Sequence, residues 1–186
     1  MTECIALLRG VNVGRAKRIA MAELRSLFLE LGHKDVRTLL NSGNVVFRCT
    51  RPNTGKLALT IQSAIADKHG FSAPVMVVTA ADLAAIVREN PLLPVAVDPA
   101  RHLVAFVAHP RSLVPLRPLM KESWAPDALA IGSRAAYLWC AAGVLDSKLS
   151  HIFARRAGDA VTTRNWATVL KLQAASNGVC LDAISG

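Results

Sequence analysis

The chain has few acidic residues and few aromatic rings. Its 13 aspartates and glutamates stand against 22 lysines and arginines, which gives a net charge of +9 over 186 residues. A basic balance favours anionic partners such as nucleic acid, nucleotides, phosphorylated metabolites or an acidic protein, although it also keeps a protein in solution without any ligand. Aromatic residues make up only 5% of the chain. RNA recognition by base stacking therefore has little support, since it needs aromatic rings on exposed strands, whereas binding to a phosphate backbone stays open.

The chain also lacks clustered cysteines, a signal peptide and a long apolar run. Its four cysteines, Cys4, Cys49, Cys140 and Cys180, lie far apart, which excludes a zinc-type spacing or a C-x-x-C pair and favours buried reduced thiols. The first residues read as a strand and include an acidic side chain, unlike a signal peptide. The longest apolar run, 135–145, is too short to span a bilayer. We therefore expect a cytoplasmic protein with no membrane partner.

Sequence signatures of familiar catalytic sites are missing as well. The chain contains no Gly-x-Ser-x-Gly, His-Glu-x-x-His, P-loop or dinucleotide-binding motif. Its five histidines are scattered, and no pair of carboxylates suggests a general acid and base. The sequence therefore predicts no cofactor and no metal site, names no catalytic residue, and leaves open whether the protein is an enzyme.

The first part of the chain predicts a ferredoxin-like arrangement. Apolar runs and period-two alternation indicate strands, helical spacing indicates helices, and Asn41-Ser42-Gly43-Asn44 indicates a hairpin turn. The predicted order is a strand over 4–9, a helix over 21–31, strands over 36–40 and 45–49, a helix over 54–69 and a strand over 74–78. This βαββαβ order predicts a mainly antiparallel sheet with both helices on one face.

The second part of the chain predicts a similar layout that ends in helices. A capping box at Thr79 begins a helix that stops before Pro91, and residues 90–100 are rich in proline. The elements expected after it are a strand over 102–107, a weak helix over 112–122, strands over 127–131 and 135–140, a helix over 147–157 and a last helix capped by Thr163. The predicted fold class is α+β, with a ferredoxin-like half over 1–79, a helix and proline-rich linker over 80–100 and a second α+β half over 101–186.

A basic, glycine-punctuated loop follows the first strand. Gly10 and Gly14 allow positive φ angles and a close backbone approach, so the N–H groups between them can form an anion-binding nest. Lys17 and neighbouring arginines add positive charge, and no polar side chain is placed to cap the helix that starts at Met21. The uncapped N–H groups of that helix favour an anion. The alternative is a solvated loop that uses glycine only to turn.

Two further polar stretches are candidates for a binding site. Asn41, Ser42 and Asn44 place three polar side chains at the tip of the predicted hairpin, where turn chemistry alone is the alternative. In Thr162-Thr163-Arg164-Asn165-Trp166 a cap at Thr163 would put Arg164 and Asn165 in the first turn of the last helix. An arginine there opposes the helix dipole. An anion bound at the helix start would explain it, and so would a structural salt bridge.

Four motifs, taken together and in this order, resemble the bacterial domain of unknown function 1697 family. They are Arg9-Gly10-Val11-Asn12-Val13-Gly14, Met21-Ala22-Glu23-Leu24-Arg25, Asn41-Ser42-Gly43-Asn44-Val45-Val46-Phe47 and Thr162-Thr163-Arg164-Asn165-Trp166. The resemblance extends over nearly the whole chain. It implies a bacterial cytoplasmic protein built from two ferredoxin-like halves, and it implies no activity. It draws attention to the residues that match the family's motifs: Arg9, Asn12, Gly14, Ser42, Asn44, Arg164 and Asn165.

These observations predict a cleft between the two halves that binds a small anionic, phosphate-bearing ligand. In this hypothesis Arg9, Lys17 and Arg164 hold the anionic group, and Asn12, Asn41, Ser42 and Asn44 orient the rest of the ligand. Gly10, Gly14 and Asn165 belong to the same site, and Tyr137 and Lys148 are further candidates. The alternatives are an enzyme acting on phosphorylated metabolites or nucleotides, non-specific nucleic-acid binding, and a structural oligomer without a ligand. The sequence determines neither the ligand nor the oligomeric state.

Overall fold

The computed structural model describes residues 1–14, 16–50 and 52–178, and they form two compact units. The first unit contains residues 1–83 together with the segment that begins at Lys171, and the second contains residues 84–170. The division falls inside the stretch that the sequence predicted as a linker, 80–100. The last helix supplies residues to both units, which the sequence did not predict.

The first unit has the predicted βαββαβ order. Its elements are β1 (Thr2–Leu8), α1 (Met21–Glu30), β2 (Lys34–Leu39), β3 (Asn44–Cys49), α2 (Thr54–His69) and β4 (Val75–Thr79). The signals that end these elements act as expected: Asn53 caps α2 through its side chain, and Gly70 closes that helix at a φ of 72°. Glycine adopts this left-handed conformation without strain, because it has no Cβ.

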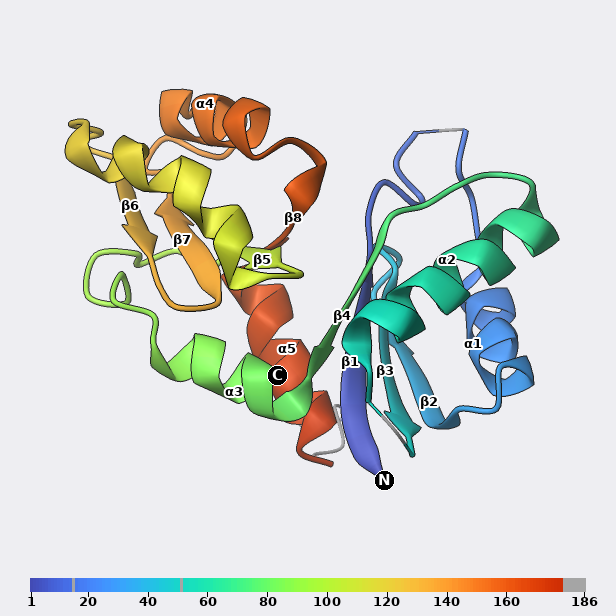
Figure 1. Ribbon diagram of the computed structural model, residues 1–186. Helices are drawn as coiled ribbons and strands as arrows, with labels where there is room; N and C mark the ends of the chain where they lie inside the picture. Colours follow the sequence, from blue (N-terminus) through green and yellow to red (C-terminus); the bar gives the residue numbers. More distant parts are fainter. Residues whose placement is uncertain (15, 51, 179–186) are drawn as a thin grey trace. The chain divides into compact units, whose positions relative to one another are not determined.

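The sheet of the first unit is antiparallel throughout and has the order β2-β3-β1-β4. Alternate residues of β1, namely Cys4, Ala6 and Leu8, join the core that also contains Leu24 and Phe28 of α1 and Ile61 and Ile65 of α2. Both helices therefore cover the same face of the sheet, as Figure 1 shows. Residues of the opposite parity on β1, such as Glu3 and Ile5, face the other side.

The second unit is built on the same plan. After α3 (Ala80–Arg88) it contains β5 (His102–Val107), the 3₁₀ helix η1 (Pro110–Lys121), β6 (Ala128–Ile131), β7 (Ala135–Trp139), α4 (Lys148–Ala157), the short 3₁₀ helix η2 (Gly158–Ala160), β8 (Val161–Asn165) and α5 (Trp166–Ser176). The capping box predicted at Thr79 is present, because the Asp82 N–H donates to Thr79 Oγ1 at 3.1 Å. Pro115 and Pro118 lie inside η1, which explains why this segment does not form a regular α-helix.

The strand β8 corrects the sequence prediction for the end of the second unit. Thr163 does not cap a helix, because it lies in β8 and pairs with Ala105 of β5. Helix α5 begins at Trp166, and Asn165 caps it by accepting a hydrogen bond from the Thr168 N–H at 2.9 Å. Threonine suits both a strand and an N-cap, so the local sequence does not decide between them. The pairing of residues 161–165 with β5 makes this segment a strand.

The second sheet has the order β6-β7-β5-β8 and is also antiparallel. This is the strand order of the first sheet, with η1 and α4 in the places of α1 and α2. Leu113 and Leu116 of η1 pack with Leu149 and Phe153 of α4 over one face of the sheet. The predicted α+β fold with two ferredoxin-like halves is therefore confirmed. Among the described residues, no helix has the length and apolar character needed to cross a membrane.

Candidate functional site

The loop between β1 and α1 has a backbone in which the sign of φ alternates. The φ angles of Gly10, Asn12 and Gly14 are 71°, 56° and 69°, and neither Val11 nor Val13 between them has a positive value. Left-handed residues in such a loop can turn neighbouring N–H groups toward the same side of the chain, as in an anion-binding nest. The sequence predicted positive φ at both glycines. It did not predict the left-handed conformation of Asn12.

Asn12 holds this loop closed. Its side-chain amide donates to the backbone oxygens of Ile19 and Asn41 at 2.9 and 2.8 Å, and its side-chain oxygen accepts from the Ile19 N–H at 3.0 Å. The Asn12 N–H also donates to the Lys17 oxygen at 2.7 Å. An asparagine amide has two N–H donors, and both are used here. Asn12 therefore fixes the shape of the loop and ties it to the β2–β3 turn.

Three basic side chains accompany the loop. Lys17 Nζ donates to the backbone oxygen of Ser72 at 2.9 Å. Arg18 donates from Nε and from its second terminal nitrogen to the Gly14 oxygen, at 3.3 and 3.2 Å. Arg9 is partly buried at the end of β1, where its own N–H donates to the Pro74 oxygen at 2.9 Å. Ala20, before α1, offers no side-chain cap.

The β2–β3 turn is held by Asn44, which is fully buried. Its amide donates to the Leu39 oxygen at 3.0 Å and to Ser42 Oγ at 2.9 Å. Gly43 lies against the β1–α1 loop: its oxygen accepts from the Leu8 N–H at 2.8 Å, and a Cβ at this position would lie 2.5 Å from Val11 Cγ2. The two loops that the sequence singled out in the first unit are therefore packed together.

Arg164 and Asn165 belong to the second unit. Asn165 is the N-cap of α5, and a terminal nitrogen of Arg164 donates to the Thr163 oxygen at 2.9 Å. Burial lowers the pKa of Arg164 to about 10, which leaves it charged at neutral pH. Arg164 lies in a strand, so the helix-dipole argument for its presence no longer applies. Tyr137, a further candidate, is buried and donates to the Ile86 oxygen at 2.7 Å.

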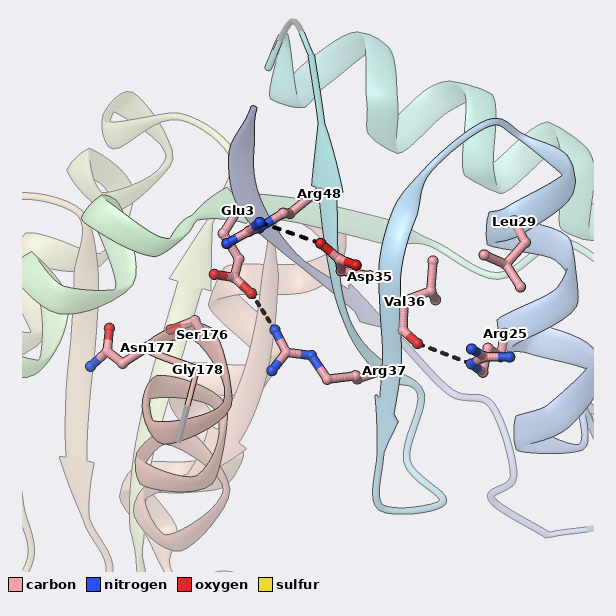
Figure 2. Close-up of a pocket in the computed structure, with 10 residues that line it drawn as sticks. All are labelled: Glu3, Arg25, Leu29, Asp35, Val36, Arg37, Arg48, Ser176, Asn177 and Gly178. Atoms are coloured by element: carbon pink, nitrogen blue, oxygen red, sulfur yellow. Dashed lines mark hydrogen bonds and ion pairs between the residues drawn. The ribbon is translucent and has the colours of Figure 1, made fainter. Parts of the chain in front are cut away.

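A second candidate site, which the sequence did not indicate, lies at the β2 edge of the first sheet. Figure 2 shows this pocket, with a volume of about 630 Å³, between α1, β2 and the end of α5. Its charged lining residues are Glu3, Arg25, Asp35, Arg37 and Arg48, and the other residues that line it are Leu29, Val36, Ser176, Asn177 and Gly178. All of them belong to the first unit. The pocket residues come from separate stretches of the sequence and form no motif, so no sequence pattern indicates them.

Four of the five charged side chains that line this pocket form two ion pairs. Arg37 donates to Glu3, and a terminal nitrogen of Arg48 lies 3.4 Å from Asp35. On the α1 side of β2, Arg25 Nε donates to the Val36 oxygen at 3.0 Å. The side chains of Asp35 and Arg48 are 61% and 49% exposed, whereas that of Glu3 is only 14% exposed. The Glu3 carboxylate is thus the most shielded of these charges, whereas its partner Arg37 is 40% exposed and the Asp35–Arg48 pair faces solvent.

The described residues do not offer metal or thiol chemistry at either place. No group of three or more histidines, cysteines or acidic residues among them could hold a metal ion. Cys4, Cys49 and Cys140 are free and buried, as the sequence predicted, while Cys180 lies outside the described residues. Burial, together with the neighbouring Cys49 thiol, raises the pKa of Cys4 to about 12, so this thiol stays protonated and is a poor nucleophile.

The fold and the loops define a small α+β protein of two ferredoxin-like halves with a polar, basic loop cluster on the first. A solved structure has a similar fold: the conserved bacterial protein SP0830 from Streptococcus pneumoniae is similar over 94% of this chain and 98% of that chain, with a TM-score of 0.73 and 21% sequence identity. No curated protein matches the chain.

Residues 1–137 match the family described as protein of unknown function (DUF1697), and the chain belongs to that family. The resemblance found in the sequence is therefore confirmed. The match is shorter than the motifs suggested, because it ends before the motif that contains Arg164 and Asn165.

Proposed function

We propose that this protein binds an anionic, phosphate-bearing ligand at the loop between β1 and α1. The observation that carries the proposal is the alternation of φ through Gly10, Asn12 and Gly14 beside a group of basic side chains. Such a backbone presents several N–H dipoles to one anion. It is already held in this shape by Asn12, so the ligand does not have to order the loop, which lowers the entropic cost of binding.

The backbone donors of the loop support this proposal. The N–H groups of Arg9 and Asn12 are used in bonds to Pro74 and Lys17. Those of Gly10, Val11 and Val13 donate to no atom of the described residues. These are the donors that we assign to the anion.

The basic side chains support it as well. Lys17 uses one donor on the Ser72 oxygen, and an ammonium group has three. Arg18 is exposed and bonds to the loop itself. Both are therefore held beside the nest with donors to spare, and charge-assisted hydrogen bonds to a phosphate are stronger than neutral ones. Arg164 and Asn165 lie in the second unit, and the proposal does not depend on them.

The test is a titration of ¹⁵N-labelled protein with inorganic phosphate, followed by NMR. We expect the amide signals of Gly10 to Gly14 to shift with a common dissociation constant. Lys17→Gln should weaken binding at least tenfold, since a hydrogen bond to a charged group contributes about 1.5–3 kcal/mol. Lys56→Gln, which removes the same charge from an exposed position on α2, should change it less than twofold. Unshifted loop signals, or equal effects of the two variants, would refute the proposal.

A purely structural role of the polar motifs is the second candidate. It is favoured by Asn12 and Asn44, whose amide groups both bond within the loops. In that case phosphate leaves the spectrum unchanged, while Asn12 variants still destabilise the fold. An enzymatic activity and a nucleic-acid partner stay alternatives from the sequence, and a cytoplasmic location stays a prediction from it.

A further inference from the structure

We propose that the pocket at the β2 edge is a second binding site, which takes a small organic anion with a carboxylate or phosphate group. Its volume of about 630 Å³ lies within the range of small-molecule sites in proteins. It is separate from the β1–α1 loop, because none of its lining residues belongs to that loop.

The sheet register places two guanidinium groups around one carboxylate. Glu3 of β1 is directly opposite Arg48 of β3, and opposite residues of neighbouring antiparallel strands lie on the same face with Cβ atoms about 5 Å apart. Arg37 of β2 reaches Glu3 as well, and Figure 2 shows all three side chains on the same side of the sheet. Two positive charges thus flank one negative charge. The charged residues that line the whole pocket are three arginines and two acids, which give it a net charge of +1.

Both arginines have donors for a further anion. A guanidinium group carries five N–H donors, and the bond from Arg37 to Glu3 involves only one of its terminal nitrogens. Arg37 Nε is buried and has no hydrogen-bond partner in the part of the chain that the structure describes. Because protein atoms cover Nε, the donors of Arg37 that an anion can reach are its terminal N–H groups, and the side chain as a whole is 40% exposed.

The ion pair between Arg48 and Asp35 is the one that a ligand anion can replace. Their contact is 3.4 Å long, and both side chains are about half exposed or more. Such surface pairs contribute little to stability. An incoming carboxylate or phosphate can therefore replace Asp35 at Arg48 at small cost, and bind Arg37 and Arg48 together. Asn177, at the end of α5, lines the same pocket and offers an amide to the ligand's remaining polar groups.

The experiment uses three probes of similar size: glycerol 3-phosphate, glycerate and glycerol. In NMR titrations of the full chain we expect one of the two anions to shift the Arg37 Nε–H and Asn177 amide signals, and glycerol to shift neither. The anion that binds more tightly identifies the group that the site selects. Shifts at the pocket without shifts at Gly10 to Gly14 would support this inference and count against the proposed function. Shifts at Gly10 to Gly14 without shifts at the pocket would support the proposed function and count against this inference.

Matched variants separate the pocket from general charge effects. Arg48→Gln should weaken binding at least tenfold, whereas Arg155→Gln, at an exposed position on α4, should leave it within twofold. Glu3→Gln removes the carboxylate that competes for Arg37 and should tighten binding several-fold. Glu30→Gln changes the net charge equally outside the pocket, where Glu30 pairs with Lys68, and should not tighten it. Absent shifts at Arg37 Nε, or equal effects of the two glutamate variants, would overturn the inference.

Discussion

Replacing Asn12 by glycine removes a set of loop hydrogen bonds without adding backbone strain to the folded loop. Asn12 has a φ of 56°, a conformation that glycine adopts freely and that most other residues resist. An alanine variant would add the cost of this strain to the loss of the side chain. Asn12→Gly therefore isolates what the asparagine amide contributes to the first unit.

The magnitude follows from three side-chain bonds. They join Asn12 to the Ile19 oxygen at 2.9 Å, the Asn41 oxygen at 2.8 Å and the Ile19 N–H at 3.0 Å. A net contribution of about 0.5–1.5 kcal/mol each gives a loss of about 2–4 kcal/mol in the free energy of unfolding of the first unit. Asn53→Gly is the control, because Asn53 makes one side-chain bond, to the Lys56 N–H at 2.9 Å, and its loss should cost less than about 1 kcal/mol.

Urea unfolding gives the two free energies, and amide hydrogen exchange locates the effect. The Ile19 N–H donates to Asn12, so its exchange should become much faster in Asn12→Gly and stay unchanged in Asn53→Gly. Equal losses of stability in the two variants would show that Asn12 does not hold the loop. So would an Ile19 amide that exchanges at the same rate in the variant and in the original protein.

Three further predictions test the fold. Gly43→Ala should destabilise the first unit by about 2–5 kcal/mol, because it combines left-handed strain with a Cβ placed 2.5 Å from Val11 Cγ2. Gly14→Ala, with open space around its Cβ, should cost only about 1–2 kcal/mol, and equal losses in urea unfolding would contradict this contact. Burial lowers the pKa of His102 to about 4, so below pH 6.5 the unfolded chain binds a proton more readily than the folded one does. The stability of the second unit should therefore fall as the pH is lowered from 6.5 to 4. This dependence on pH should be missing in a His102→Gln variant that still folds. Asn165→Ala should cost about 1 kcal/mol as a lost N-cap, with circular dichroism during thermal unfolding as the measurement; an unchanged midpoint would contradict the cap.

The candidate residues divide into those that shape the loops and those that remain for a ligand. Asn12 and Asn44 stood out in the sequence as polar residues of a binding site, yet the structure shows their amide groups bonded to the loops themselves. The side chains of Lys17 and Arg18 each contact a single backbone oxygen, that of Ser72 between α2 and β4 and that of Gly14 in the β1–α1 loop. The first pair explains how two neighbouring loops keep a fixed shape, and the second pair supplies the charge on which the proposed function depends.

The sequence by itself determined most of the local structure. Apolar periodicity located the first six elements because each half-buried strand or helix repeats its core residues with the period of its own geometry. Asn53, Gly70 and the Thr79–Asp82 box marked the ends of helices, since these side chains act on backbone groups three or four residues away. The glycines of the basic loop indicated that positive φ angles are allowed there, because glycine has no Cβ.

Tertiary structure alone decided the features that depend on residues distant in sequence. β8 exists because β5 offers it a partner, and its threonines are equally suited to a helix cap. Asn12 takes a left-handed conformation because its side chain is held by Ile19 and Asn41. The edge pocket brings Glu3, Arg37 and Arg48 together from three strands, and only the register of the folded sheet places those charges side by side.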